Sequence, residues 1–368
     1  SFVWFRRKYQ IRIGQNVGPQ CVPGIHYLKN ILLSGKQNML ILLQNQLDLF
    51  FVLLFLMVLY FMNTLSFVDG GEKFSCIIST PKSVGNYKEL AKSYPHISIV
   101  KQNIMTMFQN ISKGNIVIVP PTPGKNPIHI VLFARILTLF GGRVIGFRDR
   151  SRINSFFYET IISFNPKILF IELLFQILPH LKIKPVIPRV SLDFPKKEIG
   201  ISRPYIVVHP FGSSDGRSIL GSKLDSLLEN LLKIFSKELV LVTGSVEDSG
   251  KISFKNERVK NVAGKYDLSE MPSVLDGADL YIGVDTGITH LASVLHKRSI
   301  VIAEQGTPHW LPYYNPQATI IYTIKGDMSG IHHGRDYLEA IRPEGVTRYL
   351  DRVSIDCIIQ TIKNAIHE

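Results

Sequence analysis

The sequence predicts an α/β protein with two doubly wound parallel sheets, and three observations support this prediction. From residue 38 onward, short apolar strands alternate with helical patterns. An aperiodic stretch at residues 182–204, which contains four prolines, interrupts the alternation. The same alternation then restarts and continues to the final helical pattern. Strands that alternate with helices indicate βαβ units, and therefore parallel sheets.

The interruption also sets the expected domains, because proline-rich segments without periodicity are typical of linkers. We expect a first Rossmann-like domain at residues 38–190 and a second at residues 200–350, facing each other across a cleft. Residues 351–368 are expected to form a C-terminal helix, and residues 1–37 are an extension with no assigned role. A chain of 368 residues is long enough to bury two cores of ordinary size.

Each element is expected where an apolar or amphipathic pattern occurs. In the first half, strands are expected at residues 38–44, 74–80, 96–100, 115–119 and 143–147, with helices at 49–62, 84–94 and 128–141. In the second half, strands and the loops that follow them are expected at residues 205–214, 238–245, 258–264, 279–285 and 298–308. Helices are expected at residues 223–236, 267–278, 286–296 and 354–367.

The charge and cysteine content restrict the function less sharply. Lys and Arg outnumber Asp and Glu by 42 to 29, which gives a formal net charge of +13. This excess fits either solubility or attraction to an anionic partner such as a nucleic acid, an acidic lipid surface or a phosphorylated substrate. The three cysteines are far apart and form no C-x-x-C pair, so a reducing cytoplasmic setting is expected.

Residues 49–62, "LFFVLLFLMVLYFM", form a run of 14 consecutive apolar residues. A membrane-spanning helix needs about 20 such residues, and polar residues bracket this run closely. A buried or interfacial helix is the favoured interpretation, and a true span is the alternative.

In a parallel sheet, ligands bind beyond the carboxyl ends of the strands, so the segment "DTGITH" that follows the strand at 279–284 is the first candidate site. The first amides of the helix have no intrahelical partner, and the helix dipole favours an anion there. Gly287 would let a diphosphate approach, while the Thr286 hydroxyl and His290 could each form a hydrogen bond with it. The alternative is that Asp285 only caps the helix and that His290 is a core residue.

The triplet "DTG" also occurs in aspartic proteases, which need two carboxylates from two such copies. This chain has a single "DTG", and a helical pattern follows it. The protease interpretation is therefore rejected.

Three further loops carry candidate residues. The loop "HPFGSSDGRS", 209–218, offers Ser213 and the Arg217 guanidinium to a phosphate. Glu247, in "TGSVED", could accept hydrogen bonds from ribose hydroxyls, or it is an ordinary solvated acid. Asp48, after the first strand, could serve as a general base, or it is a helix N-cap.

No metal is implied by the sequence. The chain has no D-x-D pair and no cluster of cysteines and histidines. The adjacent residues His332 and His333 lie between glycines and are interpreted as a surface loop.

Residues 261–313 resemble the C-terminal signature of glycosyltransferase family 9, the heptosyltransferase family. They contain "DTGITHLA", which matches the family's aspartate, small hydroxylated residue and glycine followed by His-Leu-Ala, and then "GTPHWLP". The resemblance extends more weakly from about residue 38 to residue 366. It implies the GT-B fold and an inverting, metal-independent transfer of a sugar, usually heptose, from ADP-heptose onto the lipopolysaccharide inner core.

The resemblance also implies roles for individual residues. Thr286, Gly287 and His290 would contact the donor diphosphate, and Asp285 would order their loop. Arg217 takes the place of a phosphate-binding lysine, with Ser213 beside it in the same loop. Glu247 would hold the ribose, and Asp48 matches the presumed catalytic base. No cofactor is implied besides the nucleotide-sugar substrate.

The implied partners are a nucleotide sugar, an anionic glycolipid or oligosaccharide acceptor, and the cytoplasmic face of the inner membrane, where the protein would be peripheral. Leu47 stands where the family has a glycine before its aspartate. A nucleotide-sugar-binding protein with weak or no catalysis is therefore kept as the alternative. A nucleic-acid partner is not expected, because only the net charge would support it.

Overall fold

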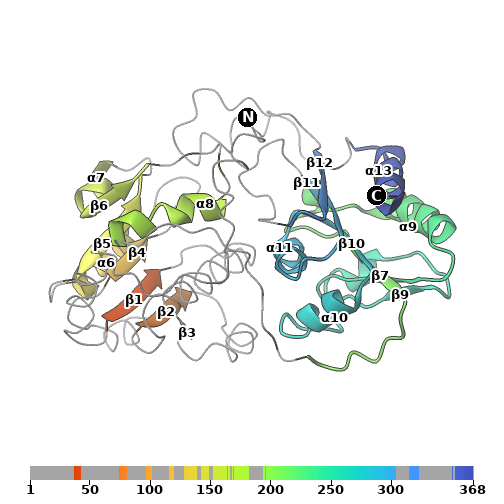
Figure 1. The fold of residues 1–368 in the computed structure, drawn as a ribbon, viewed down its shortest axis with the longest axis horizontal. Helices are drawn as coiled ribbons and strands as arrows, with labels where there is room; N and C mark the ends of the chain where they lie inside the picture. Colours follow the sequence, from red (N-terminus) through yellow and green to blue (C-terminus); the bar gives the residue numbers. More distant parts are fainter. Residues whose placement is uncertain are drawn as a thin grey trace, which may run out of the picture. The chain divides into compact units, whose positions relative to one another are not determined.

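The computed structural model describes two six-stranded, wholly parallel sheets in one chain (Figure 1). The residues that the structure describes are 37–42, 74–80, 97–101, 116–119, 128–138, 142–148, 152–163, 165, 168, 170–181, 194, 196–303, 315–322, 350 and 353–367. Of the extension expected at residues 1–37, residues 1–36 lie outside them, as does the apolar run at 49–62, while Gln37 belongs to the first strand. Among the described residues, no helix is long and apolar enough to cross a membrane.

The first sheet has the strand order β3-β2-β1-β4-β5-β6. Its strands are β1 (Gln37–Leu42), β2 (Phe74–Thr80), β3 (Ile97–Lys101), β4 (Ile116–Val119), β5 (Arg143–Phe147) and β6 (Thr160–Ile162). The described helical segments in this half are α6 (Ile128–Leu137), α7 (Arg152–Phe156), α8 (Phe170–Phe175) and the 3-10 turn η1 (Leu178–Leu181).

The second sheet repeats this order as β9-β8-β7-β10-β11-β12. Its strands are β7 (Tyr205–His209), β8 (Leu239–Val242), β9 (Val259–Asn261), β10 (Leu280–Val284), β11 (Ser299–Ala303) and β12 (Ala318–Tyr322). The helices are α9 (Gly221–Ile234), α10 (Met271–Gly277), α11 (Gly287–Val294) and α13 (Ile355–His367), with the 3-10 turns η2 (Asp215–Arg217) and η3 (Ser249–Lys251).

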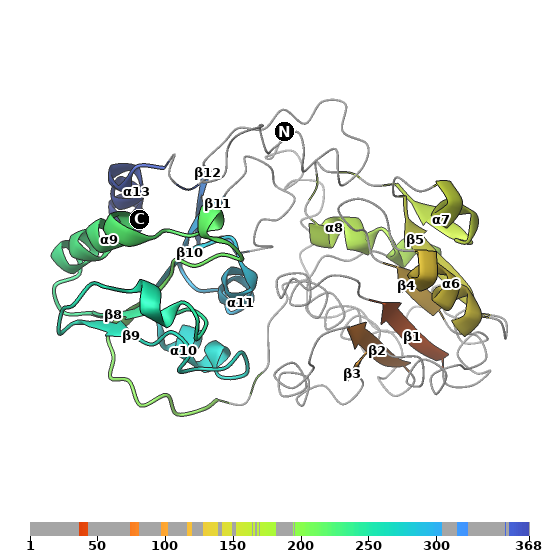
Figure 2. The same cartoon turned by 180° about the vertical axis from the view of Figure 1, so that it is seen from behind.

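Helices cover both faces of the second sheet. The connection β7–α9–β8 and the connection β10–α11–β11 advance in opposite directions along the sheet. Since such crossovers are right-handed, α9 and α11 lie on opposite faces. Both views show α13 beside α9 and α10 near α11 (Figures 1 and 2). The central strands between two helix layers are mostly apolar, and all five residues of β10 and of β11 are buried.

The core of this half combines the two helices of one face with the sheet. The apolar side of α9 contributes Leu224, Leu227, Leu228 and Leu231, all of them buried. From α13, Ile358 and Ile362 are fully buried in the same cluster. The C-terminal helix is therefore an integral part of the core that supports the second sheet.

The sequence predicted the strands and helices of both sheets with four exceptions among the described residues. The strands β6 and β12 and the helices α7 and α8 were not predicted. The first three have only three to five residues, and no clear apolar run bounded by turn residues marked them in the sequence. The expected helix at residues 84–94 lies outside the described part of the chain, and the exact domain boundaries stay a prediction.

Candidate functional site

The strand order places the candidate loops of the second sheet at one point. Strands β7 and β10 are neighbours, and the chain leaves them in opposite directions along the sheet. Such a switch point opens a crevice beyond the carboxyl ends of the two strands, where doubly wound folds bind their ligands. The loop with Ser213 and Arg217 follows β7, and the turn with Asp285 and Thr286 follows β10.

The turn between β10 and α11 is held by buried hydroxyl groups. The Thr289 Oγ1 donates a hydrogen bond to the Val284 carbonyl at 2.6 Å. The Tyr281 hydroxyl lies 2.8 Å from the same Oγ1 and therefore acts as the donor to it. Burial raises the pKa of Tyr281, so this hydroxyl stays protonated. The first turn of α11 is thereby fixed onto its strand.

Thr286 is the N-cap residue of α11 and has an extended backbone, with φ −148° and ψ 174°. Its side chain makes no capping hydrogen bond to the helix. The first amides of an α-helix lack intrahelical acceptors and point outward from its N-terminus. An anion at this turn would meet these amides together with the positive end of the helix dipole.

His290 is the fourth residue of α11 and is 1% exposed. Burial lowers its pKa to about 3, so the imidazole is neutral at physiological pH. Its Nε2 lies 3.8 Å from the Asp285 Oδ1, which is longer than a hydrogen bond. Both this Nε2 and the Thr286 Oγ1 are buried without a hydrogen-bond partner among the residues that the structure describes. Polar atoms buried in this way normally bind something, and a ligand at this turn would satisfy them.

Arg217 joins the two loops of the switch point. Its Nη1 donates to the Ser213 Oγ at 3.1 Å, and its Nη2 lies 3.7 Å from the Asp285 Oδ2. The side chains of Arg217 and Asp285 are only 20% and 11% exposed. The structure thus brings together Ser213, Arg217 and Asp285, with Thr286, Gly287 and His290 in the turn that follows.

Glu247 does not share the contacts of this group. It is exposed, and its hydrogen bonds stay within its own turn. A bond from its own backbone N–H, and then one from the Ser245 hydroxyl, lower the pKa of Glu247. Its role toward a ribose is not tested by these contacts and stays a prediction.

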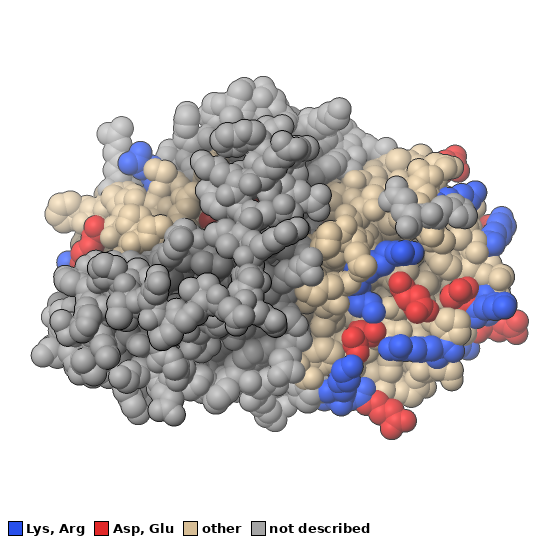
Figure 3. Space-filling view, in the orientation of Figure 1, with Lys and Arg blue, Asp and Glu red and all other residues tan. Residues whose placement is uncertain are grey.

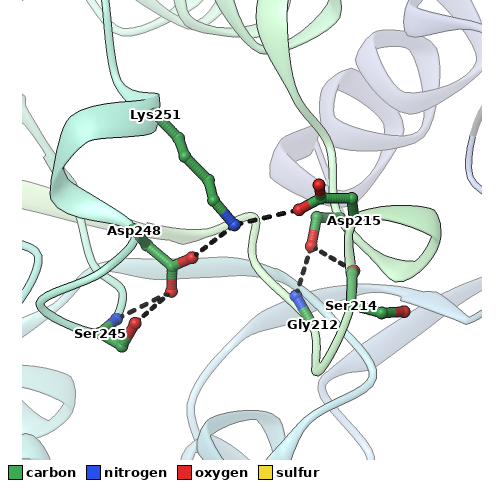
Figure 4. Close-up of polar contacts among 7 residues, drawn as sticks. Gly212, Ser214, Asp215, Ser245, Asp248 and Lys251 are labelled. Atoms are coloured by element: carbon green, nitrogen blue, oxygen red, sulfur yellow. Dashed lines mark hydrogen bonds and ion pairs between the residues drawn. The ribbon is translucent and has the colours of Figure 1, made fainter.

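Sequence reasoning missed a charged bridge between the loops after β7 and β8. The Lys251 Nζ lies 3.0 Å from the Asp215 Oδ1 and 3.1 Å from the Asp248 Oδ1 (Figure 4). We call these three residues the Lys251 bridge. Lys251 is nearly forty residues beyond Asp215 along the chain, and the sequence held no signal that would pair them.

A second missed pair lies at the ends of the same two strands. The His209 Nδ1 and the Thr243 Oγ1 are 2.9 Å apart, and the Thr243 hydroxyl also lies 3.3 Å from the Val208 carbonyl. Burial lowers the pKa of His209 to about 4, so this imidazole is neutral as well. Two neutral histidines therefore lie at the carboxyl end of the second sheet.

A cavity in this half lies away from the switch point. It has a volume of about 570 Å³ and is lined by residues 196–203, Tyr205 and part of α10. Because Tyr205 begins β7, this cavity lies at the amino ends of the strands. It is separate from the candidate donor site.

Several predicted features lie outside the described residues or are only partly described. Asp48 and the pair His332–His333 are outside them. Within the described ranges, no three His, Cys, Asp or Glu side chains are grouped so that they could hold a metal ion.

On the face drawn in Figure 3, the described Lys and Arg side chains are interspersed with Asp and Glu.

Solved structures with the same fold include three glycosyltransferases. The glycosyl transferase family 9 protein of Veillonella parvula DSM 2008 is 12% identical, with a TM-score of 0.62 and coverage of 91% of this chain and 98% of that one. Heptosyltransferase WaaC of E. coli, solved with ADP, is 13% identical, with a TM-score of 0.61 and coverage of 89% and 99%. WaaC has also been solved with ADP-2-deoxy-2-fluoro heptose.

The third is the iron-containing dodecameric glycosyltransferase TibC of enterotoxigenic E. coli H10407. It is 14% identical, with a TM-score of 0.56 and coverage of 91% of this chain and 79% of that one. These likenesses establish the GT-B fold predicted from the sequence. No curated protein matches the chain.

The family model of glycosyltransferase family 9 (heptosyltransferase) matches residues 134–337, which is more than half of the 368 residues. This match covers the whole switch-point site described above. The chain therefore belongs to glycosyltransferase family 9, the heptosyltransferase family, and is a glycosyltransferase.

Proposed function

We propose that this enzyme transfers heptose from ADP-heptose to a hydroxyl group of a lipopolysaccharide-type acceptor, with inversion at the anomeric carbon and without a bound metal. The observation that carries the proposal is the group at the switch point of the second sheet. It combines Arg217, the N-terminus of α11 and two buried polar atoms without described partners. A nucleoside diphosphate is an anion that offers acceptors to all of these donors.

The site would act mainly on the departing diphosphate. As the bond between the anomeric carbon and the diphosphate oxygen breaks, negative charge grows on that oxygen. The guanidinium of Arg217 and the amides that follow Thr286 would stabilise this charge. A neutral His290 can donate only if its Nε2 carries the proton, and this tautomer is part of the proposal.

Asp285 would position these groups without contacting the diphosphate itself. Its carboxylate has the Arg217 Nη2 on one side, at 3.7 Å, and the His290 Nε2 on the other, at 3.8 Å. Since a carboxylate repels a phosphate, a direct contact with the donor would be unfavourable. Attraction to the guanidinium would instead keep Arg217 directed toward the turn before α11.

The acceptor would be activated by Asp48 from the first half of the chain. Its carboxylate would take the proton of the acceptor hydroxyl while that oxygen bonds to the anomeric carbon and the nucleotide diphosphate leaves. An attack from the side opposite the leaving group inverts the configuration. The permanent charge of Arg217 would meet the role that a metal ion plays in other transferases, which supports metal independence.

The acceptor and its location belong to the same proposal. A net charge of +13 would favour a phosphorylated glycolipid at the cytoplasmic face of the inner membrane, where the enzyme would be peripheral. A second function, nucleotide-sugar binding with weak or no catalysis, is favoured by Leu47 before Asp48. Both functions predict that the protein binds the donor, but only the first predicts that it transfers the sugar.

The test measures ADP binding by calorimetry, and transfer from ADP-heptose to a purified inner-core acceptor with EDTA present. We expect micromolar binding that weakens at least tenfold in Arg217→Ala and in Thr286→Ala/His290→Ala, a loss of about 1.4 kcal/mol or more. Asp48→Ala should bind ADP normally and lose at least a hundredfold in rate, as removal of a general base does. Lys233→Ala, which removes an exposed ion pair on α9, is the control.

Three outcomes would contradict the proposal in different ways. Unchanged ADP affinity in both donor-site variants would reject the diphosphate assignment. An unchanged transfer rate in Asp48→Ala would reject the base. If the wild-type enzyme binds ADP but shows no transfer with any acceptor, the binding function replaces the catalytic one.

A further inference from the structure

The loops after β7 and β8 are cross-linked by a single ammonium group, that of Lys251. Its Nζ contacts one carboxylate oxygen of Asp215 and one of Asp248, at 3.0 and 3.1 Å (Figure 4). The same Nζ lies 6.0 Å from the centroid of the Phe211 ring, which is in the β7 loop. A lone exposed ion pair contributes little, but one cation held by two carboxylates belongs to a network.

Asp248 anchors one side of the Lys251 bridge. Its Oδ2 accepts hydrogen bonds from the Ser245 amide at 3.0 Å and from the Ser245 hydroxyl at 2.8 Å. Burial raises the pKa of Asp248, but the bonds from Ser245 and Lys251 outweigh this and lower it. The Asp248 side chain is 13% exposed. This carboxylate is therefore charged and fixed to the loop after β8.

Asp215 is on the other side, in the same 3-10 turn as Arg217. This turn is closed from within, because the Gly212 amide donates to the Ser218 Oγ at 2.9 Å and that hydroxyl donates to the Ser214 carbonyl at 2.8 Å. A side chain at position 212 would meet the Arg217 carbonyl oxygen at 2.4 Å. Such a compact turn moves as a unit, so a force on Asp215 also acts on Arg217.

We propose that Lys251 is a positioning residue for donor binding, which holds the turn of Arg217 in place by bridging Asp215 to Asp248. The inference rests on the proposed function of the switch-point site. Together with the contact between Arg217 and Asp285, the bridge links the carboxyl ends of three neighbouring strands, in the order β10, β7 and β8. Without Lys251, the two carboxylates repel each other and the turn loses its support.

The loss of Lys251 would also change the charge near the donor. The bridge holds two carboxylates and one ammonium group. Removal of the Lys251 ammonium therefore leaves two uncompensated negative charges in the loops that would face the diphosphate. Both effects weaken the binding of an anion. Arginine at this position keeps the charge and can contact both carboxylates.

The experiment measures ADP affinity by calorimetry for Lys251→Met, Lys251→Arg and the matched control Lys233→Met, whose ammonium also lies 2.9 Å from a carboxylate on the surface of the same half. We expect the Kd to rise about tenfold in Lys251→Met, a change of about 1.4 kcal/mol, and to stay within about twofold in the other two variants. Melting temperatures establish that each variant is folded.

A double-mutant cycle tests whether Lys251 acts through Arg217. If it does, Lys251→Met should raise the Kd of Arg217→Ala by clearly less than the roughly tenfold expected in the wild type, because only the effect of the changed charge remains. Fully additive losses would overturn the inference, because Lys251 would then act independently. An unchanged Kd in Lys251→Met, with the expected loss in Arg217→Ala, would also overturn it. If Arg217→Ala itself binds ADP normally, the donor site is wrong and the proposed function fails with it.

Discussion

The Asp285 carboxylate lies 3.7 Å from the guanidinium of Arg217, although the two residues follow different strands of the second sheet. Both side chains are largely shielded from solvent, and their attraction is therefore stronger than that of a surface ion pair. The contact therefore fixes the direction of the one permanent cation described at the switch point.

Removal of the Asp285 charge should weaken donor binding. In Asp285→Asn, the amide is similar in shape to the carboxylate but no longer attracts Arg217. We expect the Kd for ADP to rise about fivefold to tenfold, which corresponds to about 1–1.4 kcal/mol. The control is Asp279→Asn, which makes the same change at an exposed position just before β10, at the opposite end of that strand. Equal affinities for the two variants would contradict the prediction.

The two neutral histidines should make the enzyme less stable in mild acid. Burial lowers the pKa of His209 to about 4 and of His290 to about 3, from a usual value of 6.5. Below pH 6.5 the unfolded chain therefore binds protons that the folded protein does not. The stability is fully present above pH 6.5 and falls by up to about 1.4 kcal/mol per pH unit for each histidine as the pH drops toward 4.

Urea unfolding between pH 7 and pH 4.5 measures this slope. His290→Gln should be less sensitive to pH than the wild type over this range, because glutamine does not titrate. His180→Gln, which changes an exposed histidine, should leave the slope unchanged. A wild-type stability that is constant between pH 6.5 and pH 4.5 would show that neither histidine is kept neutral by burial.

Gly283 is required by the ring that lies over it. A side-chain carbon at this position would be 2.2 Å from the Tyr281 hydroxyl oxygen, which belongs to the next residue on the same face of β10. Gly283→Ala should therefore lower the free energy of unfolding by about 1–3 kcal/mol. Gly250→Ala is the control, because a carbon there meets no atom within 4 Å. Equal melting temperatures for the two variants would be incompatible with the close contact.

The C-terminal helix should be as important for stability as the helices between the strands. Ile362 is fully buried in the core of the second sheet, so Ile362→Ala should cost about 2–5 kcal/mol. Lys363→Ala, one residue further along and exposed, should cost less than about 0.5 kcal/mol. Denaturant unfolding of both variants checks this difference. A small loss in Ile362→Ala would indicate that α13 is only loosely attached.

The fold could be predicted because its strands are buried on both faces and read as continuous apolar runs. Residues 205–208 and 280–284 are examples, and both lie wholly inside the protein. The strand β6 was missed, since its three residues take their place from the pairing with β5 and not from a pattern of their own. The strand β12 likewise takes its place from its pairing with β11 more than from its own pattern.

The site was predictable to the extent that topology decides it. Loops after neighbouring parallel strands must meet, so the proximity of Arg217 and Asp285 follows from the strand order. The strand order does not determine which of the adjacent residues Glu247 and Asp248 is buried. Glu247 was chosen from the sequence, but the turn buries most of Asp248 and exposes Glu247. Likewise, His290 is a core residue by its burial, while its Nε2 has no hydrogen-bond partner among the described residues.

The two sheets have the same strand order, so each has a switch point beside its own first strand. The segment after β1 and the segment after β7 are therefore equivalent positions in a repeated architecture. The first contains Asp48, six residues beyond the end of its strand, and the second contains Arg217, eight residues beyond. In the mechanism proposed above, the first repeat would supply the proton acceptor and the second a fixed positive charge. An enzyme that activates an incoming oxygen and releases an outgoing one would need a carboxylate in one of these two equivalent loops and a cation in the other.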